Sequence, residues 1–274
     1  MKTVFITGCS SGIGYTCAHG LAKQGYSVFA TCRNDADVKR LQDEGLNAFK
    51  LDLCDSASLH VALAWMLSQT EGRIDVLFNN AAYGQPGAVE DLKRNVLREQ
   101  FETNVFGTQE LTNLVLPYMR KQKSGKIIYN SSILGFVAMS YRGAYNASKF
   151  AIEGLADTLR LELHDTGIDV VLIEPGPIRS NFRKNALAKF LTNIDQERSA
   201  HKEIYAKTLE RLQKSGDGAF TLGAEAVLEV LVHALEVKKP KFRYPVTFPT
   251  KLFVWLKRML PTSWMDTIAR KAGD

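Results

Sequence analysis

Hydrophobic and polar positions alternate along the chain in blocks that predict strands and helices in turn. Short apolar runs predict strands at residues 3–6, 26–31, 47–51, 74–78, 126–129 and 170–174. Apolar residues at helical spacing predict helices at residues 15–25, 37–44, 56–70, 96–120 and 144–163. Ser56 is the expected N-cap of the third helix, and Gly167 is the expected stop after the last. This alternation is typical of an α/β fold with a doubly wound parallel sheet and helices on both faces.

Small and polar residues follow four of the predicted strands. These segments are residues 7–14, 79–84, 130–132 and 175–177. In such sheets ligands bind at the carboxyl ends of the strands, so we expect the four segments to converge there. The first has the spacing G-x-x-x-G-x-G and opens a helix. Glycines let the backbone approach a phosphate closely, and a helix N-terminus offers N–H groups and a favourable dipole.

Composition agrees with one α/β domain. The chain has 274 residues and a formal net charge of +6, which a solvated surface and a phosphate-bearing ligand explain without nucleic acid. Cys9, Cys17, Cys32 and Cys54 show no C-x-x-C spacing and read as free thiols, and no metal site is expected. The first strand begins at about residue 3, which leaves no room for a signal peptide. We therefore expect a cytoplasmic protein.

Tyr145 and Lys149 stand four residues apart in the predicted helix 144–163, so that both lie on one face. A free phenol has a pKa of about 10 and is a poor acid or base near neutrality. A nearby positive charge favours the phenolate and lowers that pKa. The pair is therefore a candidate for proton transfer. The structural alternative is a half-buried tyrosine beside a solvated lysine.

Together these features make the chain resemble the short-chain dehydrogenase/reductase superfamily. The resemblance covers residues 1 to about 185 and rests on Thr7-Gly8-x-x-x-Gly12-Ile13-Gly14, Asn79-Asn80-Ala81-Ala82, Asn104, Ser132, Tyr145-x-x-x-Lys149 and Pro175-Gly176. Ala82 stands where many members have glycine, but alanine is still small. The resemblance implies a single Rossmann-type oxidoreductase domain over residues 1–274. Within the superfamily the chain resembles, more loosely and through its tail, NADP-dependent hydroxysteroid or retinol dehydrogenase-like and aldehyde reductase members.

The resemblance also implies a role for each matching residue. Tyr145 would exchange a proton with the substrate oxygen, and Ser132 would hydrogen-bond the same oxygen. Lys149 would lower the pKa of Tyr145 and hold the nicotinamide ribose. Asn104 would hold a water that links Lys149 to solvent. The expected dinucleotide-binding residues are Gly8, Ser10, Ser11, Gly12, Ile13, Gly14, Arg33, Asp52, Leu53, Asn80, Ala81, Ala82, Tyr145, Lys149, Pro175, Gly176 and Ile178.

The end of the second predicted strand favours NADP(H) over NAD(H). NAD-preferring folds carry an acidic residue there, which binds the ribose 2′-hydroxyl. Here the position is Cys32, followed by Arg33, which can form a forked contact with a 2′-phosphate. Asp35 and Asp37 come slightly later and could still act as the acidic residue that favours NAD(H). A solvated surface role for Arg33 is the alternative.

The C-terminal part carries weaker signals. Residues of about 180–220 are amphipathic, and the resemblance implies a mobile lid over the substrate, with an ordinary helix pair as the alternative. A helix is expected at 222–237 and a short strand at 243–246. The tail, about residues 245–274, is apolar-rich but too short and too charged to span a bilayer. It could lie on a membrane surface, cover the substrate cleft, or pack on the core or a second subunit.

The sequence thus leads to an expected NADP(H)-dependent oxidoreductase that interconverts a lipophilic alcohol and its aldehyde or ketone, with carbonyl reduction favoured. One alternative is an NAD-dependent alcohol or hydroxysteroid dehydrogenase. Another is a dinucleotide-binding redox sensor without catalysis. The expected partners are a small lipophilic substrate and further copies of the chain in a homo-oligomer, with weak membrane contact through the tail left open.

Overall fold

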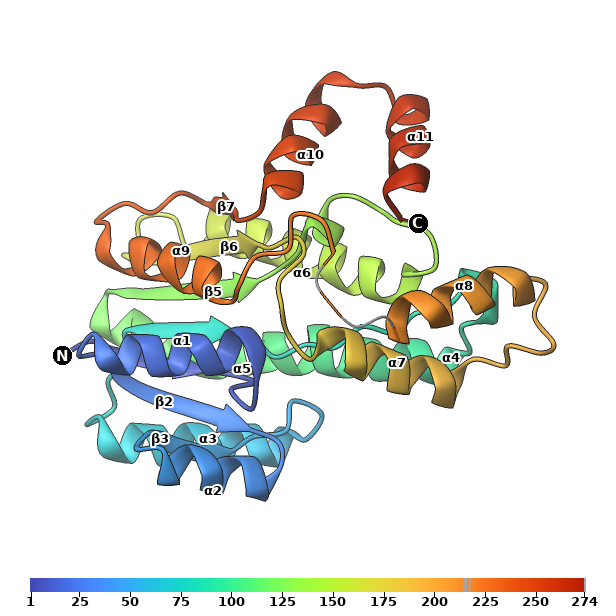
Figure 1. Cartoon of the computed structure of the whole chain (residues 1–274). Coiled ribbons are helices and arrows are strands. Elements are labelled where there is room, and N and C mark those ends of the chain that lie inside the picture. The colour runs from blue at the N-terminus through green and yellow to red at the C-terminus, as the bar shows by residue number, and fades with distance from the viewer. Residues whose placement is uncertain (214–215, 217, 274) are drawn as a thin grey trace.

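Seven parallel strands form one sheet at the centre of the molecule (Figure 1). The computed structural model describes residues 1–213, 216 and 218–273. The strand order is β3-β2-β1-β4-β5-β6-β7, which confirms the predicted doubly wound arrangement. The strands are β1 (Thr3–Ile6), β2 (Ser27–Cys32), β3 (Asn47–Lys50), β4 (Val76–Asn79), β5 (Gly125–Asn130), β6 (Ile168–Glu174) and β7 (Arg243–Pro245).

Helices cover both faces of the sheet, because successive residues of a strand point to opposite sides. Val4 and Ile6 of β1 enter one core, under α1 (Gly12–Lys23), α2 (Asp35–Asp43) and α9 (Glu225–Glu236). Phe5 enters the other core, under α3 (Ser56–Gln69), α5 (Thr108–Gln122) and α6 (Gly143–Glu162). Figure 1 shows α1 and α9 on the near side of the sheet. Both faces of the sheet are therefore buried, as expected of parallel strands.

The start of α3 differs from the prediction. The helix begins after Asp55, whose carboxylate accepts a hydrogen bond from the backbone N–H of Ala57 at 3.0 Å. Asp55 is therefore the N-cap, and the prediction of Ser56 was wrong by one residue. The hydroxyl of Ser56 instead donates to Glu110. Two adjacent residues with good capping side chains cannot be distinguished by composition alone.

The continuous helix predicted at residues 96–120 is also divided. A π-helical segment, η2 (Glu102–Gly107), separates α4 (Arg94–Phe101) from α5. Gly107 lies against the backbone of the loop after β3, where an added Cβ would meet the carbonyl oxygen of Leu53 at 1.8 Å. Hydrophobic periodicity does not separate i→i−4 from i→i−5 hydrogen bonding, so the sequence did not reveal this segment.

The C-terminal part forms two helical pairs. The first comprises α7 (Phe182–Asn193) and α8 (Lys202–Gln213) and corresponds to the predicted lid region, of which residues 214, 215 and 217 lie outside the described residues. The second comprises α10 (Phe248–Met259) and α11 (Thr262–Gly273), which project from the body beyond β7 (Figure 1). No helix in the described part of the chain is long and apolar enough to cross a membrane.

Candidate active site

A cleft of about 1760 Å³ opens at the carboxyl ends of the strands. It is walled by the loops after the strands, by α7 and by the start of α10. Every residue predicted to bind a dinucleotide or to act in proton transfer lines it, apart from Asn104. These residues are Gly8, Ser10, Ser11, Gly12, Ile13, Gly14, Arg33, Asp52, Leu53, Asn80, Ala81, Ala82, Ser132, Tyr145, Lys149, Pro175, Gly176 and Ile178.

The glycine loop fits a pyrophosphate group. A Cβ on Gly8 would lie 2.8 Å from the Cα of Ala81, and a Cβ on Gly14 would lie 2.2 Å from the carbonyl oxygen of Gly8. Only glycine allows this close packing. The N-cap of α1, Ser11, makes no side-chain cap hydrogen bond, and the first turn holds no acidic residue. The N-terminal N–H groups and the helix dipole are thus available to an anion in the cleft.

Thr7 and Asn130 fix this loop, and neither was among the predicted site residues. The hydroxyl of Thr7 accepts hydrogen bonds from the backbone N–H groups of Asn80 and Ala81, both at 3.0 Å. The side-chain amide of Asn80 donates to the carbonyl oxygens of Thr7 and Gly8. The amide of Asn130 donates to the side-chain oxygen of Asn80 at 2.9 Å. The ends of β1, β4 and β5 are therefore locked together, and the strand-end positions of Thr7 and Asn130 were the available signal.

The acidic residues near Arg33 are engaged by other basic groups. Asp37 pairs with Arg40 at 3.0 Å, and Asp35 pairs with Lys50 at 2.7 Å. Arg33 itself is exposed and lines the cleft directly after β2. The charge at this end of the cleft is therefore suited to an anionic group. The sequence left open that Asp35 or Asp37 binds the ribose 2′-hydroxyl of NAD. These ion pairs make both carboxylates less available for that role.

Tyr145 and Lys149 lie together at the centre of the cleft, as their spacing predicted. The ammonium group of Lys149 is 5.7 Å from the centroid of the Tyr145 ring and donates to the carbonyl oxygen of Asn130 at 2.7 Å. Burial lowers the pKa of Lys149 to about 8, and the carboxylate of Glu153 opposes this shift. Burial raises the pKa of Tyr145, with the Ser132 hydroxyl opposing. The sequence led us to expect a lowered pKa for Tyr145, whereas burial raises it.

Asn104 lies behind the cleft, within the π-helical segment. Its side-chain amide donates to the carbonyl oxygen of Tyr83 and to the hydroxyl of Ser148, both at 3.0 Å, and its oxygen accepts from the Tyr83 N–H. Ser148 in turn donates to the carbonyl oxygen of Tyr145 at 2.8 Å. Asn104 therefore connects the loop after β4 to the helix that carries Tyr145. Its expected role in holding a water stays a prediction.

A cluster of carboxylates around Arg243 supports α6 from below. The guanidinium of Arg243 reaches Glu153 at 3.1 Å, Asp157 at 2.7 Å and Glu174 at 3.2 Å. Glu153 lies one turn after Lys149, and Glu174 immediately precedes Pro175. Burial is the main cause that raises the pKa of Glu174, to about 8. The cluster links α6, β6 and β7 next to the cleft. No local sequence motif predicted it.

Apolar side chains form the outer wall of the cleft. The ring of Phe182, at the start of α7, packs edge-on against the Tyr145 ring with the centroids 5.1 Å apart. Other apolar residues of this wall are Leu134, Met139, Leu187, Phe220, Phe248, Leu252 and Phe253. Phe253 also packs with Ile133 and Leu134. The tail thus both lines the cleft and packs on the body, two of the placements that the sequence left open.

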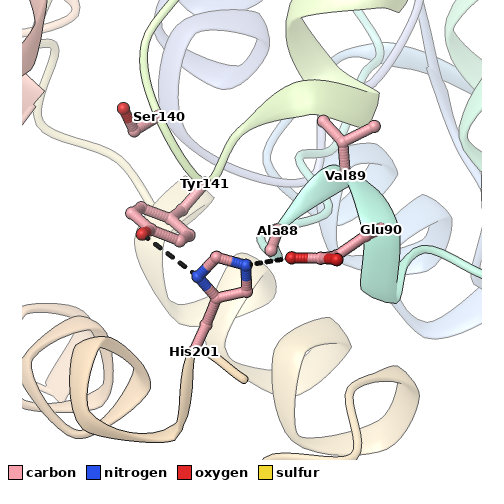
Figure 2. Close-up of a pocket in the computed structure, with 6 residues that line it drawn as sticks. All are labelled: Ala88, Val89, Glu90, Ser140, Tyr141 and His201. Carbon is pink, nitrogen blue, oxygen red and sulfur yellow. Dashed lines mark hydrogen bonds and ion pairs between the residues drawn. The ribbon is translucent and has the colours of Figure 1, made fainter. Parts of the chain in front are cut away.

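A second, smaller cavity of about 480 Å³ lies between the lid region and the 3₁₀ turn η1 (Val89–Asp91). Figure 2 shows the imidazole of His201 between Tyr141 and Glu90, with a hydrogen bond to each. Next to it, Asp91 accepts from the hydroxyl of Tyr205. No residue predicted for binding or catalysis lines this cavity. We interpret these contacts of Glu90, Asp91, Tyr141, His201 and Tyr205 as the link that holds the start of α8 to the body, and we call them the clasp.

Comparison with known proteins agrees with this geometry. The profile of the short chain dehydrogenase family matches residues 2–190. The chain is 40% identical to the uncharacterized oxidoreductase YbbO of Escherichia coli, covering 97% of this chain and 93% of that protein. It is 34% identical to human 17-beta-hydroxysteroid dehydrogenase type 1, covering 93% and 80% respectively.

A solved structure agrees as well. A short-chain dehydrogenase from Streptomyces avermitilis superimposes with a TM-score of 0.78 at 29% identity, covering 97% of this chain and 93% of that one. The site residues, the sheet order and these likenesses lead to one conclusion: the chain belongs to the short-chain dehydrogenase/reductase family.

Proposed function

We propose that the protein is an NADP(H)-dependent reductase of lipophilic aldehydes or ketones. The observation that carries the proposal is that Tyr145, Ser132 and Lys149 line one cleft, beside an apolar wall that includes Phe182. The buried phenol keeps its proton at neutral pH because burial raises its pKa. A protonated phenol can donate to a carbonyl oxygen, which favours reduction as the working direction.

The residues of the cleft divide the chemistry among them. A bound nicotinamide cofactor would supply or accept the hydride. Tyr145 would transfer the proton to the substrate oxygen, and the Ser132 hydroxyl would stabilise the charge that develops there. The ammonium group of Lys149, with its donor bond to Asn130, would hold the ribose and favour the phenolate after transfer. Asn104 would keep α6 in register with the loop after β4.

The preference for NADP(H) rests on Arg33. Arg33 lines the cleft directly after β2, and the nearby acids Asp35 and Asp37 are held by Lys50 and Arg40. A doubly charged phosphate gains more from a guanidinium than a neutral hydroxyl does. Arg40, which pairs with Asp37 and Glu44, also donates to the carbonyl oxygen of Ser10 at 2.7 Å and so ties α2 to the glycine loop.

A lipophilic substrate is supported by the wall of the cleft and by one relative. Phe182, Leu187, Leu252 and Phe253 give the cleft an apolar side next to Tyr145. Pockets of this kind bind apolar ligands and orient them with few polar groups. One relative reported above is a 17-beta-hydroxysteroid dehydrogenase by name, and steroids are apolar alcohols and ketones.

Cofactor oxidation across a panel of carbonyls tests the proposal. We expect NADPH oxidation with long-chain aldehydes or polycyclic ketones, and lower efficiency with small polar carbonyls. The same panel with NADH tests the NAD-dependent alternative. Tight binding of NADPH without turnover of any carbonyl or alcohol would instead favour a dinucleotide-binding sensor.

A further inference from the structure

An exposed apolar stripe runs along the outer side of α10. Phe248, Leu252, Trp255 and Met259 are separated by four, three and four residues, a spacing that places them on one side of a helix. Their exposed fractions are 59%, 41%, 65% and 76%. The opposite side of α10 is the one that packs on the body, through Thr250 and Phe253. α10 is therefore apolar on a face that is largely exposed in the described part of the chain.

The stripe is continuous with the mouth of the cleft. Phe248 and Leu252 belong to both the stripe and the cleft wall. The ring of Phe220, which is 60% exposed, lies 5.3 Å from that of Phe248 and also lines the cleft. An apolar molecule resting on the stripe would thus find an apolar route towards Tyr145.

The charges around the stripe are of one sign. α10 carries Lys251, Lys257 and Arg258 and no acidic residue, and residues 248–273 hold five basic residues and one acidic residue. Lys251 lies about one turn from both Phe248 and Trp255, so it borders the stripe. Basic residues beside an exposed Trp and Phe face are typical of a helix that lies at the surface of an anionic bilayer. A second copy of the chain would bring like charges together.

We propose that α10 docks on the surface of a membrane rich in anionic phospholipid and that a lipophilic substrate enters the cleft from it. The stripe would lie among the acyl chains near the headgroups, with Lys251 and Arg258 against the lipid phosphates. The docking stands on the stripe and its charges. Only the entry of substrate rests on the proposed function.

Flotation with liposomes tests the docking, without cofactor or substrate. The full chain is mixed with vesicles of phosphatidylcholine alone or with phosphatidylglycerol. We expect it to float with the anionic vesicles and to be released by high salt. The double variant Trp255→Ser/Met259→Ser, outside the cleft wall, should partition at least about tenfold less. Val61→Ser, an exposed apolar residue on α3, is the matched control and should float like the wild type.

A second pair of variants tests the charges. Lys251→Gln/Arg258→Gln should reduce binding to anionic vesicles, whereas Lys23→Gln/Lys39→Gln, on α1 and α2, should not. A wild type that stays with the dense fraction, or a Trp255→Ser/Met259→Ser variant that floats equally, overturns the proposal. A wild-type dimer that the same variant converts to a monomer, without flotation, overturns it in favour of a second copy.

Activity separates this inference from the proposed function. The Trp255→Ser/Met259→Ser variant should reduce a small water-soluble carbonyl as fast as the wild type, but a long-chain aldehyde held in anionic vesicles more slowly. A protein that floats and reduces no carbonyl keeps the docking surface and contradicts the proposed function. A protein that reduces carbonyls and never floats contradicts the docking alone.

Discussion

At the scale of single residues, the site combines two buried ionisable groups whose pKa values are shifted in opposite directions by burial. Burial raises the pKa of the Tyr145 phenol and lowers that of the Lys149 ammonium to about 8. Perturbed groups of this kind concentrate at functional sites. Each group keeps the charge state that suits reduction at neutral pH, a protonated phenol beside a protonated amine.

The Lys149 pKa predicts how activity depends on pH. The ammonium loses its proton as pH rises through about 8, so carbonyl reduction should be highest below that value and fall above it. In Lys149→Arg the guanidinium stays charged, so whatever activity survives should lack this alkaline limb. Profiles of kcat/KM against pH for both proteins provide the check. A wild-type profile that is flat from pH 6 to 10 contradicts the assignment.

Arg33 predicts the cofactor preference. Arg33→Ala removes a charge-assisted contact to a 2′-phosphate, worth about 1.5–3 kcal/mol, so NADPH should bind about 10- to 100-fold more weakly. NADH has no such phosphate and should be little affected. Cys32→Asp should shift the preference further towards NADH, because a carboxylate can accept from the ribose hydroxyl. Titration of NADPH and NADH against each variant measures the two affinities. Equal losses of affinity for the two cofactors in Arg33→Ala would refute the role of Arg33 in binding the 2′-phosphate.

At the scale of elements, the sequence predicted the strands and most helices because buried parallel strands and amphipathic helices leave clear periodicities. It also predicted which residues line the cleft, since strand ends of a parallel sheet meet at one edge. Features that depend on long-range packing were missed. Gly107 at the end of the π-helical segment packs closely against Leu53, and Thr7 acts through partners more than 70 residues away. Local patterns do not reveal the partners in such contacts, although the position of Thr7 at a strand end marked it as a candidate.

The clasp between η1 and α8 is predicted to limit the motion of the lid region. The carboxylate of Asp91 accepts from Ser199 and Tyr205, and these hydrogen bonds lower its pKa. Asp91→Asn should weaken both bonds and speed amide hydrogen exchange in α8 by about tenfold or more. Asp195→Asn, an exposed residue in the same region, is the control and should change little. Unaltered exchange in Asp91→Asn would show that other contacts hold the lid.

At the scale of the whole molecule, one arginine joins the last strand to α6, the helix that carries Tyr145 and Lys149. Arg243 of β7 forms ion pairs with Glu153 and Asp157 of α6 and with Glu174 of β6. One positive charge cannot fully offset three carboxylates, and burial raises the pKa of Glu174 to about 8. The cluster therefore stabilises the folded protein less as Glu174 ionises.

This cluster predicts a dependence of stability on pH. Glu174 is protonated in the folded state at pH values where it is already ionised in the unfolded chain, so its contribution falls as pH rises from about 4.5 to about 8. Glu174→Gln should remove this slope and gain stability relative to the wild type towards pH 8. Thermal unfolding of both proteins at pH 5 and pH 8 measures the difference. A difference between them that does not change with pH would contradict the prediction.

The proton-donor role of Tyr145 is tested most directly by Tyr145→Phe, which removes only the phenolic hydroxyl. The variant and the wild type are compared in single-turnover oxidation of bound NADPH by a saturating lipophilic aldehyde. We predict unchanged melting temperature and NADPH affinity, with the rate lower by roughly 10²–10⁴-fold or more. Turnover close to that of the wild type would contradict the proposal that this phenol donates the proton.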